Sequence, residues 1–364
     1  MQKSHYKIKF DAQRNADFVG ELKEKVQNYF KDNNLSTHAN TGMVLKTIFM
    51  YSLYFIPLFM IYSSVPNVWQ LYLLYAVMGL SLVGLGCAVQ HDANHGAYSP
   101  HDWVNRLLGF TSLTLIGGND YMWKIKHNIL HHTYTNIYGK DEDISIVKFL
   151  RLSPQAPWKP IHRVQHILAW FAYCGLTIFW VFYFDIPKIW RYNGNGSPNP
   201  DQKHPTHEIV LMIAMKIFYV FYMLIIPFTF TTYAWYHIIG GFVLMHVIGG
   251  FLLTTIFQLA HVIEEADFPE PTQAGIIENA WFVHQLETTS NFDMKNPFLT
   301  WFIAGLNYQV EHHLFPKICS VHYPKLSTIV QDVAQKHGIA YHYHVDTPSA
   351  IASHYNALKK FSRP

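Results

Sequence analysis

The sequence predicts an all-α integral membrane protein, in which four transmembrane helices carry a cytoplasmic helical cap with a histidine-rich metal site. Three observations predict this class. Half of the 364 residues are hydrophobic and only 14% are charged, against about 25% in an ordinary soluble domain. Four apolar segments are long enough to cross a bilayer, which takes about 20 residues. The chain also contains 23 histidines, several of them clustered at helical spacing.

The predicted transmembrane helices form two pairs separated by a long polar region. They are Thr47–Val65, Val68–Ala88, Ile209–Phe230 and Trp235–Leu259. A fifth apolar run, Ile167–Phe184, is nominally long enough to cross. The histidine clusters precede and follow this run and must meet at one site, so an even number of crossings has to separate them. Because the last two helices already supply two crossings, we expect the fifth run to be interfacial or re-entrant.

The distribution of Lys and Arg predicts the orientation of the helices. The short connections 63–67 and 231–234 contain neither residue, whereas the N-terminal arm, the 89–208 region and the chain from 260 onward contain nearly all of them. By the positive-inside rule, both termini and every histidine cluster are then cytoplasmic.

Three parts follow along the chain: a cytoplasmic arm (1–43), a membrane domain (44–330) and a C-terminal tail (331–364) that packs on the cap. The arm does not resemble a signal peptide, because the first apolar run begins only near Val44. Within the arm, Asp17–Phe30 predicts a helix that docks by one face. That face carries Phe18, Leu22, Val26 and Phe30.

Charge and cysteine content exclude two other classes. The net charge of +3, with no run rich in Lys or Arg, argues against nucleic acid as a partner. Cys87, Cys174 and Cys319 lie far apart, so they predict neither a disulfide framework nor a thiolate metal site.

Three short clusters predict the metal site. They are His91-Asp92-Ala93-Asn94-His95, His127-Asn128-Ile129-Leu130-His131-His132 and Gln309-Val310-Glu311-His312-His313. Residues three or four apart share one face of a helix, so we expect His91 to converge with His95, and His127 with His131. In the third cluster, Gln309 shares a face with His312 and His313. His132 is rotated by about 100° from His131 and can address a neighbouring metal.

The number and kind of these ligands indicate two metal ions. Imidazole nitrogen suits Fe, Zn, Cu and Ni, and seven histidines with a glutamine exceed the coordination of one ion. Two irons can bind and split O2 and so attack an unactivated C–H bond, and the neighbouring membrane helices imply a lipidic substrate. Asp92 and Glu311 are expected to be hydrogen-bond partners of ligating histidines.

The other histidines are predicted to be structural or solvated. His237 and His246 lie in a membrane helix, where we expect hydrogen bonds to protein. The expected solvated residues of loops and tail are His162, His166, His204, His207, His322, His342, His344 and His354.

The three clusters resemble the histidine boxes of the membrane fatty acid desaturases. The matching segments are HDANHGAYS, HNILHHTYTN and LNYQVEHHLFP, and the resemblance extends from about residue 40 to residue 330. It implies O2-dependent desaturation of an acyl-CoA or acyl-lipid at a di-iron centre. It also implies that the iron ligands are the box histidines: His91, His95, His127, His131, His132, His312 and His313.

The third box opens with Gln309 where many desaturases have histidine, which resembles the front-end branch, as does WFVHQLETTSNF (Trp281–Phe292). That branch typically forms Δ6 or Δ5 double bonds. Gln309 either ligates iron through its side-chain carbonyl, which is the preferred interpretation, or only shapes the surroundings of the ligands. The family further implies an outlying ligand at the end of the last membrane helix, where His261 stands. The family's water-bound asparagine is replaced by Phe257, so that contact is either missing or supplied by Gln258.

The resemblance also predicts the partners. Many front-end desaturases carry a fused cytochrome b5 domain with an HPGG motif, which this chain lacks. We therefore expect a separate electron donor, either a ferredoxin or a cytochrome b5-type protein with its reductase. This reduced plan is similar to that of bacterial desaturases, which implies a bacterial cytoplasmic membrane as the location.

Two other functions remain open at the level of sequence. A di-iron hydroxylase or ketolase acting on a lipid or alkane would use a similar oxidant and differ in its oxygen-containing product. A metal transporter or a haem membrane protein would place ionisable residues along a path through the bilayer. The predicted clusters instead lie outside the apolar segments.

Overall fold

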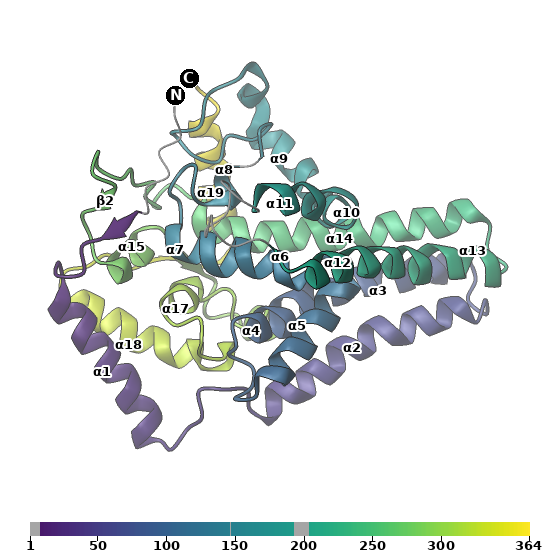
Figure 1. Cartoon of the computed structure of the whole chain (residues 1–364), viewed down its shortest axis with the longest axis horizontal. Helices are drawn as coiled ribbons and strands as arrows, with labels where there is room; N and C mark the ends of the chain where they lie inside the picture. Colours follow the sequence, from purple (N-terminus) through teal and green to yellow (C-terminus); the bar gives the residue numbers. More distant parts are fainter. Residues whose placement is uncertain (1–7, 146, 193–203) are drawn as a thin grey trace.

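The computed structural model describes residues 8–145, 147–192 and 204–364, which are mostly helical (Figure 1). Four segments are long and apolar enough to cross a membrane. They are Thr41–Tyr62, Val68–Asn94, Thr206–Phe230 and Trp235–His261. The four predicted helices are thus confirmed, although the first begins and ends earlier than expected. The long helices project from one side of the cap in Figure 1.

Two of these spans are continuous α-helices and two contain a wider π-helical turn. The continuous ones are α2 (Thr41–Tyr62) and α14 (Trp235–His261). The second span consists of α3 (Val68–Gly84), η1 (Leu85–Gln90) and α4 (His91–Asn94). The third consists of α12 (Thr206–Val220), η6 (Phe221–Ile225) and α13 (Ile226–Phe230). The turn η1 immediately precedes the first histidine box, and π-helical turns are frequent at functional sites.

Helix α14 lies at the centre of the membrane region because its glycines allow close approach. A Cβ added at Gly79 of α3 would lie only 2.7 Å from the carbonyl oxygen of Met245 in α14. A Cβ at Gly250 would lie 2.8 Å from the carbonyl oxygen of Cys174. Small residues let membrane helices pack backbone to backbone, so α14 holds α3 on one face and the fifth apolar run on another.

The fifth apolar run belongs to a pair of helical segments, 160–174 and 176–191, bent by 61° at their junction. The pair comprises η3 (Pro160–Val164), α9 (Gln165–Cys174), α10 (Leu176–Phe179), η4 (Trp180–Phe184) and α11 (Asp185–Arg191). Near the bend, the Thr177 hydroxyl donates to the carbonyl oxygen of His246 inside α14, at 3.0 Å. The bend therefore lies well down α14 from His261.

Both ends of this bent pair return to the cap. At its start, the Gln165 amide donates to the carbonyl oxygen of Leu358 in the C-terminal helix, at 2.8 Å. Just after its end, the Tyr192 hydroxyl donates to Glu142, ten residues beyond the second histidine box. A bend of this size is found in a re-entrant loop and in a broken span alike, so the interfacial or re-entrant placement stays a prediction.

Lys216 of α12 is an ammonium group inside a membrane span. Its Nζ donates to the carbonyl oxygens of Gly117 and Trp180, at 2.8 and 2.5 Å, and to Asp185 Oδ2 at 2.8 Å. The charge faces protein rather than lipid, as a charged group in a span must, and it ties α12 to the bent pair.

The cap is built from shorter helices before and after the membrane spans. Those before the third span are α1 (Ala16–Asp32), α5 (Asp102–Ile116), α6 (Asp120–Lys124), η2 (Ile125–His131), α7 (His132–Tyr134) and α8 (Glu142–Ser145). Those after α14 are α15 (Trp281–Glu287), α16 (Pro297–Phe302), α17 (Gln309–Leu314), η7 (Ser320–His322), α18 (Tyr323–Lys336) and α19 (Thr347–Phe361).

The predicted docking face of the N-terminal arm is confirmed. The four apolar side chains of α1 are buried in one cluster with Leu326 and Val330 of α18. The boundary predicted between membrane domain and tail, at 330/331, lies inside α18, so this helix belongs to both parts.

Four short strands depart from the all-α prediction. Strand β1 (Lys9–Phe10) pairs in parallel with β2 (Ile276–Ile277), and β3 (Ser290–Phe292) pairs in parallel with β4 (His342–His344). Extended segments that cross a packed cap must satisfy their backbone groups, and pairing does so. These pairs join parts of the cap that are more than 50 residues apart in sequence.

Candidate metal centre

The three histidine boxes and His261 meet where the membrane helices enter the cap. The first box ends the second span, and His261 is the last residue of α14. The second box lies on η2 and α7, and the third on α17. All eight imidazoles are at most 9% exposed. The helices therefore bring together residues separated by up to 222 positions of sequence, His91 to His313.

Two main groups of ring nitrogens lie within metal-binding distance. Within each group the ligand atoms lie within 4.8 Å of one another. One group consists of His91, His95, His127 and His312, and the other of His131, His261 and His313. His132 forms a further group with His312 and His313, and so joins the two. A fourth group consists of His127, His131 and Asp143, so the predicted convergence of His127 with His131 is confirmed. Each of the two histidines also belongs to a different main group, and both lie on the π-helical turn η2.

The spacing of individual nitrogen atoms fits coordination. His127 Nε2 is 3.2 Å from His91 Nε2 and 3.2 Å from His132 Nε2. A metal–imidazole bond is about 2 Å long, so neighbouring ligands on one ion are about 3 Å apart. The three nitrogens have the separation of atoms that share a metal.

The hydrogen-bond inventory also fits a cation at this place. Among the eight imidazoles, four Nε2 atoms are buried without a hydrogen-bond partner: those of His95, His261, His312 and His313. Buried polar atoms are normally paired, and a cation in each main group would satisfy them. Burial also lowers the pKa of His127, His132, His312 and His313 well below the usual value, and the neutral imidazole is the form that ligates.

Four of the imidazoles are oriented from behind through Nδ1. His131 donates to Asp141 Oδ2 at 3.0 Å and His313 to Gln285 Oε1 at 2.8 Å. His261 donates to the carbonyl oxygen of Thr288 at 3.2 Å, and His312 lies 3.2 Å from the Tyr323 hydroxyl. Such contacts fix the ring and direct Nε2 toward the metal. Sequence reasoning missed all four partners, although Gln285 and Thr288 lie in the quoted WFVHQLETTSNF segment.

The expected roles of Asp92 and Glu311 are wrong. Asp92 Oδ2 accepts from the Ser320 hydroxyl at 2.8 Å and from the Cys319 thiol at 3.1 Å. Glu311 accepts from the amide of Asn291 at 2.8 Å, and burial raises its pKa to about 7. Each carboxylate follows or precedes a ligating histidine by one residue, which rotates it by about 100° away from the metal face of its helix.

Asp141 and Asp143 supply the negative charge behind the second group. Asp143 Oδ2 is 3.5 Å from His131 Nδ1, and its carboxylate also pairs with Lys126. Burial alone would lower the pKa of His131, but the two carboxylates outweigh burial and raise it. This places anionic charge beside a cluster of otherwise neutral ligands.

Gln309 stands where many desaturases have a histidine, and Phe257 stands where the family's water-bound asparagine is expected. Gln309 begins α17, is 1% exposed, and its amide nitrogen has no hydrogen-bond partner. The Phe257 ring lies 6.3 Å from that of His91 and 6.4 Å from that of His127. The Oε1 of Gln258 is buried without a partner. Gln309 thus shares the helix of His312 and His313, and Phe257 gives the first group an apolar wall.

Three histidines expected on the solvated surface are buried instead. His162 is 2% exposed and accepts from the backbone N–H of Lys159, at 3.0 Å. His204 lies 3.0 Å from the Tyr121 hydroxyl. His354 bridges the Tyr173 hydroxyl, at 2.7 Å, and the carbonyl oxygen of Val262, at 2.6 Å, directly after His261. His246, which lies inside α14, is hydrogen-bonded to Tyr219 of α12, as expected.

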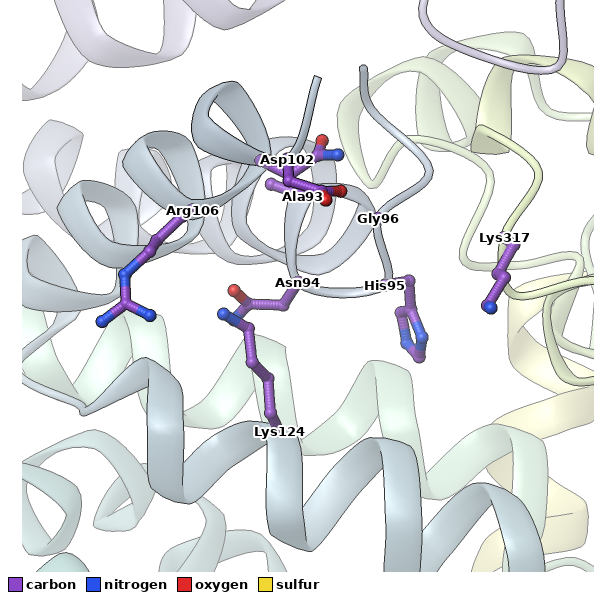
Figure 2. A pocket seen from close by; sticks show the side chains of 9 residues that line it. Ala93, Asn94, His95, Gly96, Asp102, Arg106, Lys124 and Lys317 are labelled. Carbon is purple, nitrogen blue, oxygen red and sulfur yellow. The ribbon is translucent and has the colours of Figure 1, made fainter. Parts of the chain in front are cut away.

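A polar hollow of about 460 Å³ opens beside His95 (Figure 2). His95 is the most exposed of the eight imidazoles at 9%, and its side chain lies at one edge of the hollow. Arg106, Lys124 and Lys317 also line it. Arg106 pairs with Glu208, and Lys124 with Asp120. His95 is therefore the residue through which the first group borders this hollow.

Comparison with known proteins identifies the family. The model of the fatty acid desaturase family matches residues 67–345. The sn-1 linoleoyl-lipid 6-desaturase of Arthrospira platensis is 34% identical over 96% of this chain and 94% of its own length. The enzyme of that name from Synechocystis is 34% identical over 98% of both chains. The acyl-lipid (8-3)-desaturase of Physcomitrium patens is 29% identical over 97% of this chain and 73% of its own.

The names of these relatives describe the activity that the three histidine boxes and Gln309 predict. The family model covers all three histidine boxes and His261. All eight histidines that converge in this structure therefore lie inside the matched region. The chain belongs to the fatty acid desaturase family and is an oxidoreductase of that class.

Proposed function

We propose that this protein is a di-iron, front-end acyl-lipid desaturase that forms a cis double bond at the Δ6 position. The observation that carries the di-iron assignment is the division of the buried imidazoles into two groups joined by His132. The regiochemistry is supported by the names of two relatives that match over nearly their whole length and by Gln309 at the head of the third box.

The chain's own residues supply positioning. Two irons with O2 provide an oxidant that takes hydrogen from two neighbouring methylenes. His91, His95, His127 and His312 would hold one ion, and His131, His261 and His313 the other, with His132 addressing both. Gln309 could add its side-chain oxygen. Asp141, Gln285 and Tyr323 keep the rings oriented, so the ligands need little rearrangement. Phe257 excludes water from the side facing α14.

We expect purified protein to contain about two irons per chain, since seven box histidines and His261 exceed the coordination of one ion. Elemental analysis of protein expressed in iron-replete medium provides the measurement. A ratio of one metal per chain, or zinc in place of iron, would contradict the di-iron assignment.

We expect a Δ6 product from a lipid-linked 18-carbon precursor that already carries a double bond. Gas chromatography with mass spectrometry, applied to fatty acids of a host that expresses the protein and receives defined precursors, locates the new double bond. A new bond on the methyl side, or at Δ9 of a saturated chain, would exclude the front-end assignment while leaving desaturation intact. An added oxygen would indicate a hydroxylase.

We further propose that the cap, the metal centre and both termini are cytoplasmic, in the cytoplasmic membrane of a bacterium. The absence of Lys and Arg from connections 63–67 and 231–234 supports this orientation. In a cysteine-free background, an impermeant thiol reagent outside intact cells should label Pro66→Cys and Thr232→Cys. It should not label His207→Cys, which follows the re-entrant pair and whose side chain is 74% exposed. Labelling at 207 would mean that the bent pair crosses the membrane.

A further inference from the structure

A second hollow of the cap lies between helix α1 and the segment that follows the third histidine box. It has a volume of about 680 Å³, and we name it the α1 groove. Its floor and walls are mainly apolar: Phe30, Leu35, Phe282, Phe315 and Ile318. Its rim includes Lys23 and Lys31. An apolar floor with a charged rim is the usual anatomy of a protein-binding site.

The floor of the groove is connected to the metal centre by aromatic residues. The Trp281 indole donates to the carbonyl oxygen of His132 at 3.1 Å. The rings of Trp281 and Phe282 are 5.1 Å apart, and those of Phe282 and Phe315 are 6.1 Å apart. Phe315 itself follows His313 by two residues. The groove lining is therefore linked to the second histidine box through Trp281 and to the third through Phe315.

The charged side chains that line the groove have one sign. Lys23 Nζ lies 4.9 Å from the centre of the Phe282 ring, and no acidic side chain lines the groove. Glu21 of α1 faces α18 and is paired with Lys336 and His337, each at 2.8 Å. Glu24 and Asp32 adjoin the two lysines in sequence but do not line the groove. The groove thus offers a cationic rim that complements an acidic partner.

The chemistry of desaturation requires such a partner. Removing two hydrogens from a CH2–CH2 unit releases two electrons and two protons, whereas reducing O2 to two waters consumes four of each. The other two electrons must come from outside. A one-electron carrier has to bind, deliver and leave twice for each double bond, so its docking site should be weak, small and salt-sensitive.

We propose that the α1 groove docks an acidic one-electron carrier protein, which passes its electrons over Phe282, Phe315 and Trp281 toward the metal centre. This inference rests on the proposed di-iron desaturase function and names the partner surface of that site.

The test compares a charge reversal in the groove with a matched reversal elsewhere. The variant is Lys23→Glu/Lys31→Glu; the control is Lys359→Glu/Lys360→Glu, which reverses two exposed charges at the end of α19. The probes are an acidic [2Fe–2S] ferredoxin and a soluble cytochrome b5 domain, each with its reductase.

Three quantities are measured: the Kd of each carrier for the detergent-solubilised enzyme, the rate of oxidation of the reduced carrier, and product formed in a single turnover. For that turnover the enzyme is reduced anaerobically with dithionite, desalted and exposed to air.

We expect the groove variant to raise the carrier Kd about tenfold and to flatten its dependence on salt. Its single-turnover yield after dithionite should equal that of the unmodified enzyme. The control should leave all three quantities unchanged.

Unchanged carrier binding in the groove variant would overturn the proposal, as would failure of both acidic carriers to reduce an enzyme that is active after dithionite. A loss of dithionite-driven yield would indicate a lipid- or substrate-binding groove. No product from the unmodified enzyme after dithionite would instead reject the desaturase function itself.

Discussion

His261→Ala should lose iron and all desaturation together. Its Nε2 is buried without a hydrogen-bond partner beside His131 and His313, and its Nδ1–H is held by the Thr288 carbonyl. Alanine would empty this coordination position and leave the second ion with His131, His313 and the shared His132 alone. Iron per chain, measured on purified protein, should fall to about half or less, and product should be undetectable.

His284→Ala is the matched control, because His284 is buried in the same part of the cap. Its ring lies 5.0 Å from that of Phe10, and burial lowers its pKa to about 3. Among the described residues, it belongs to none of the groups that could hold a metal. We expect His284→Ala to retain iron even if turnover falls. Full iron and activity in His261→Ala would remove it from the ligand set, and iron loss in His284→Ala would place the eighth ligand there.

Asp141→Ala should lower metal retention and activity about 10- to 100-fold, the usual effect of removing a hydrogen-bond partner of a metal-bound histidine. Asp141 is fully buried. Its Oδ2 accepts from His131 Nδ1 and from the backbone N–H of Asn136, both at 3.0 Å. Without it, the ring is free to turn and its basicity falls. The measurement is the rate of iron release to a chelator, together with turnover.

Two further variants separate orientation of the ring from general damage to the fold. Asp141→Asn retains an acceptor oxygen but loses the charge, so it should fall between wild type and Asp141→Ala. Glu142→Gln alters the next residue, which contacts Tyr192 and Arg191 rather than a histidine, and should release iron at the wild-type rate. Equal iron release from wild type and Asp141→Ala would show that His131 is oriented by other groups, with Asp143 the nearest candidate.

The elements that depend on local pattern were predictable from the sequence. Apolar length located the four membrane spans, and the spacing of Phe18, Leu22, Val26 and Phe30 located the buried face of α1. Both are properties of one segment, because a helix repeats every 3.6 residues whatever surrounds it. The three boxes identified seven converging histidines for the same reason, with His261 added by the resemblance.

The sequence by itself therefore determined which histidines converge and that they gather at the ends of membrane helices. Only the tertiary structure decided how their ring nitrogens are grouped and what orients the rings. The membership of His127 and His131 in different main groups as well as in one shared group depends on how η2 packs, and the hydrogen bonds to Gln285 and Tyr323 come from other helices. Asp92 and Glu311 adjoin ligands in the chain but point elsewhere, because a one-residue step turns a side chain by about 100°. Spacing along a helix fixes which side chains share a face, whereas the partner of that face is set by how the helices pack.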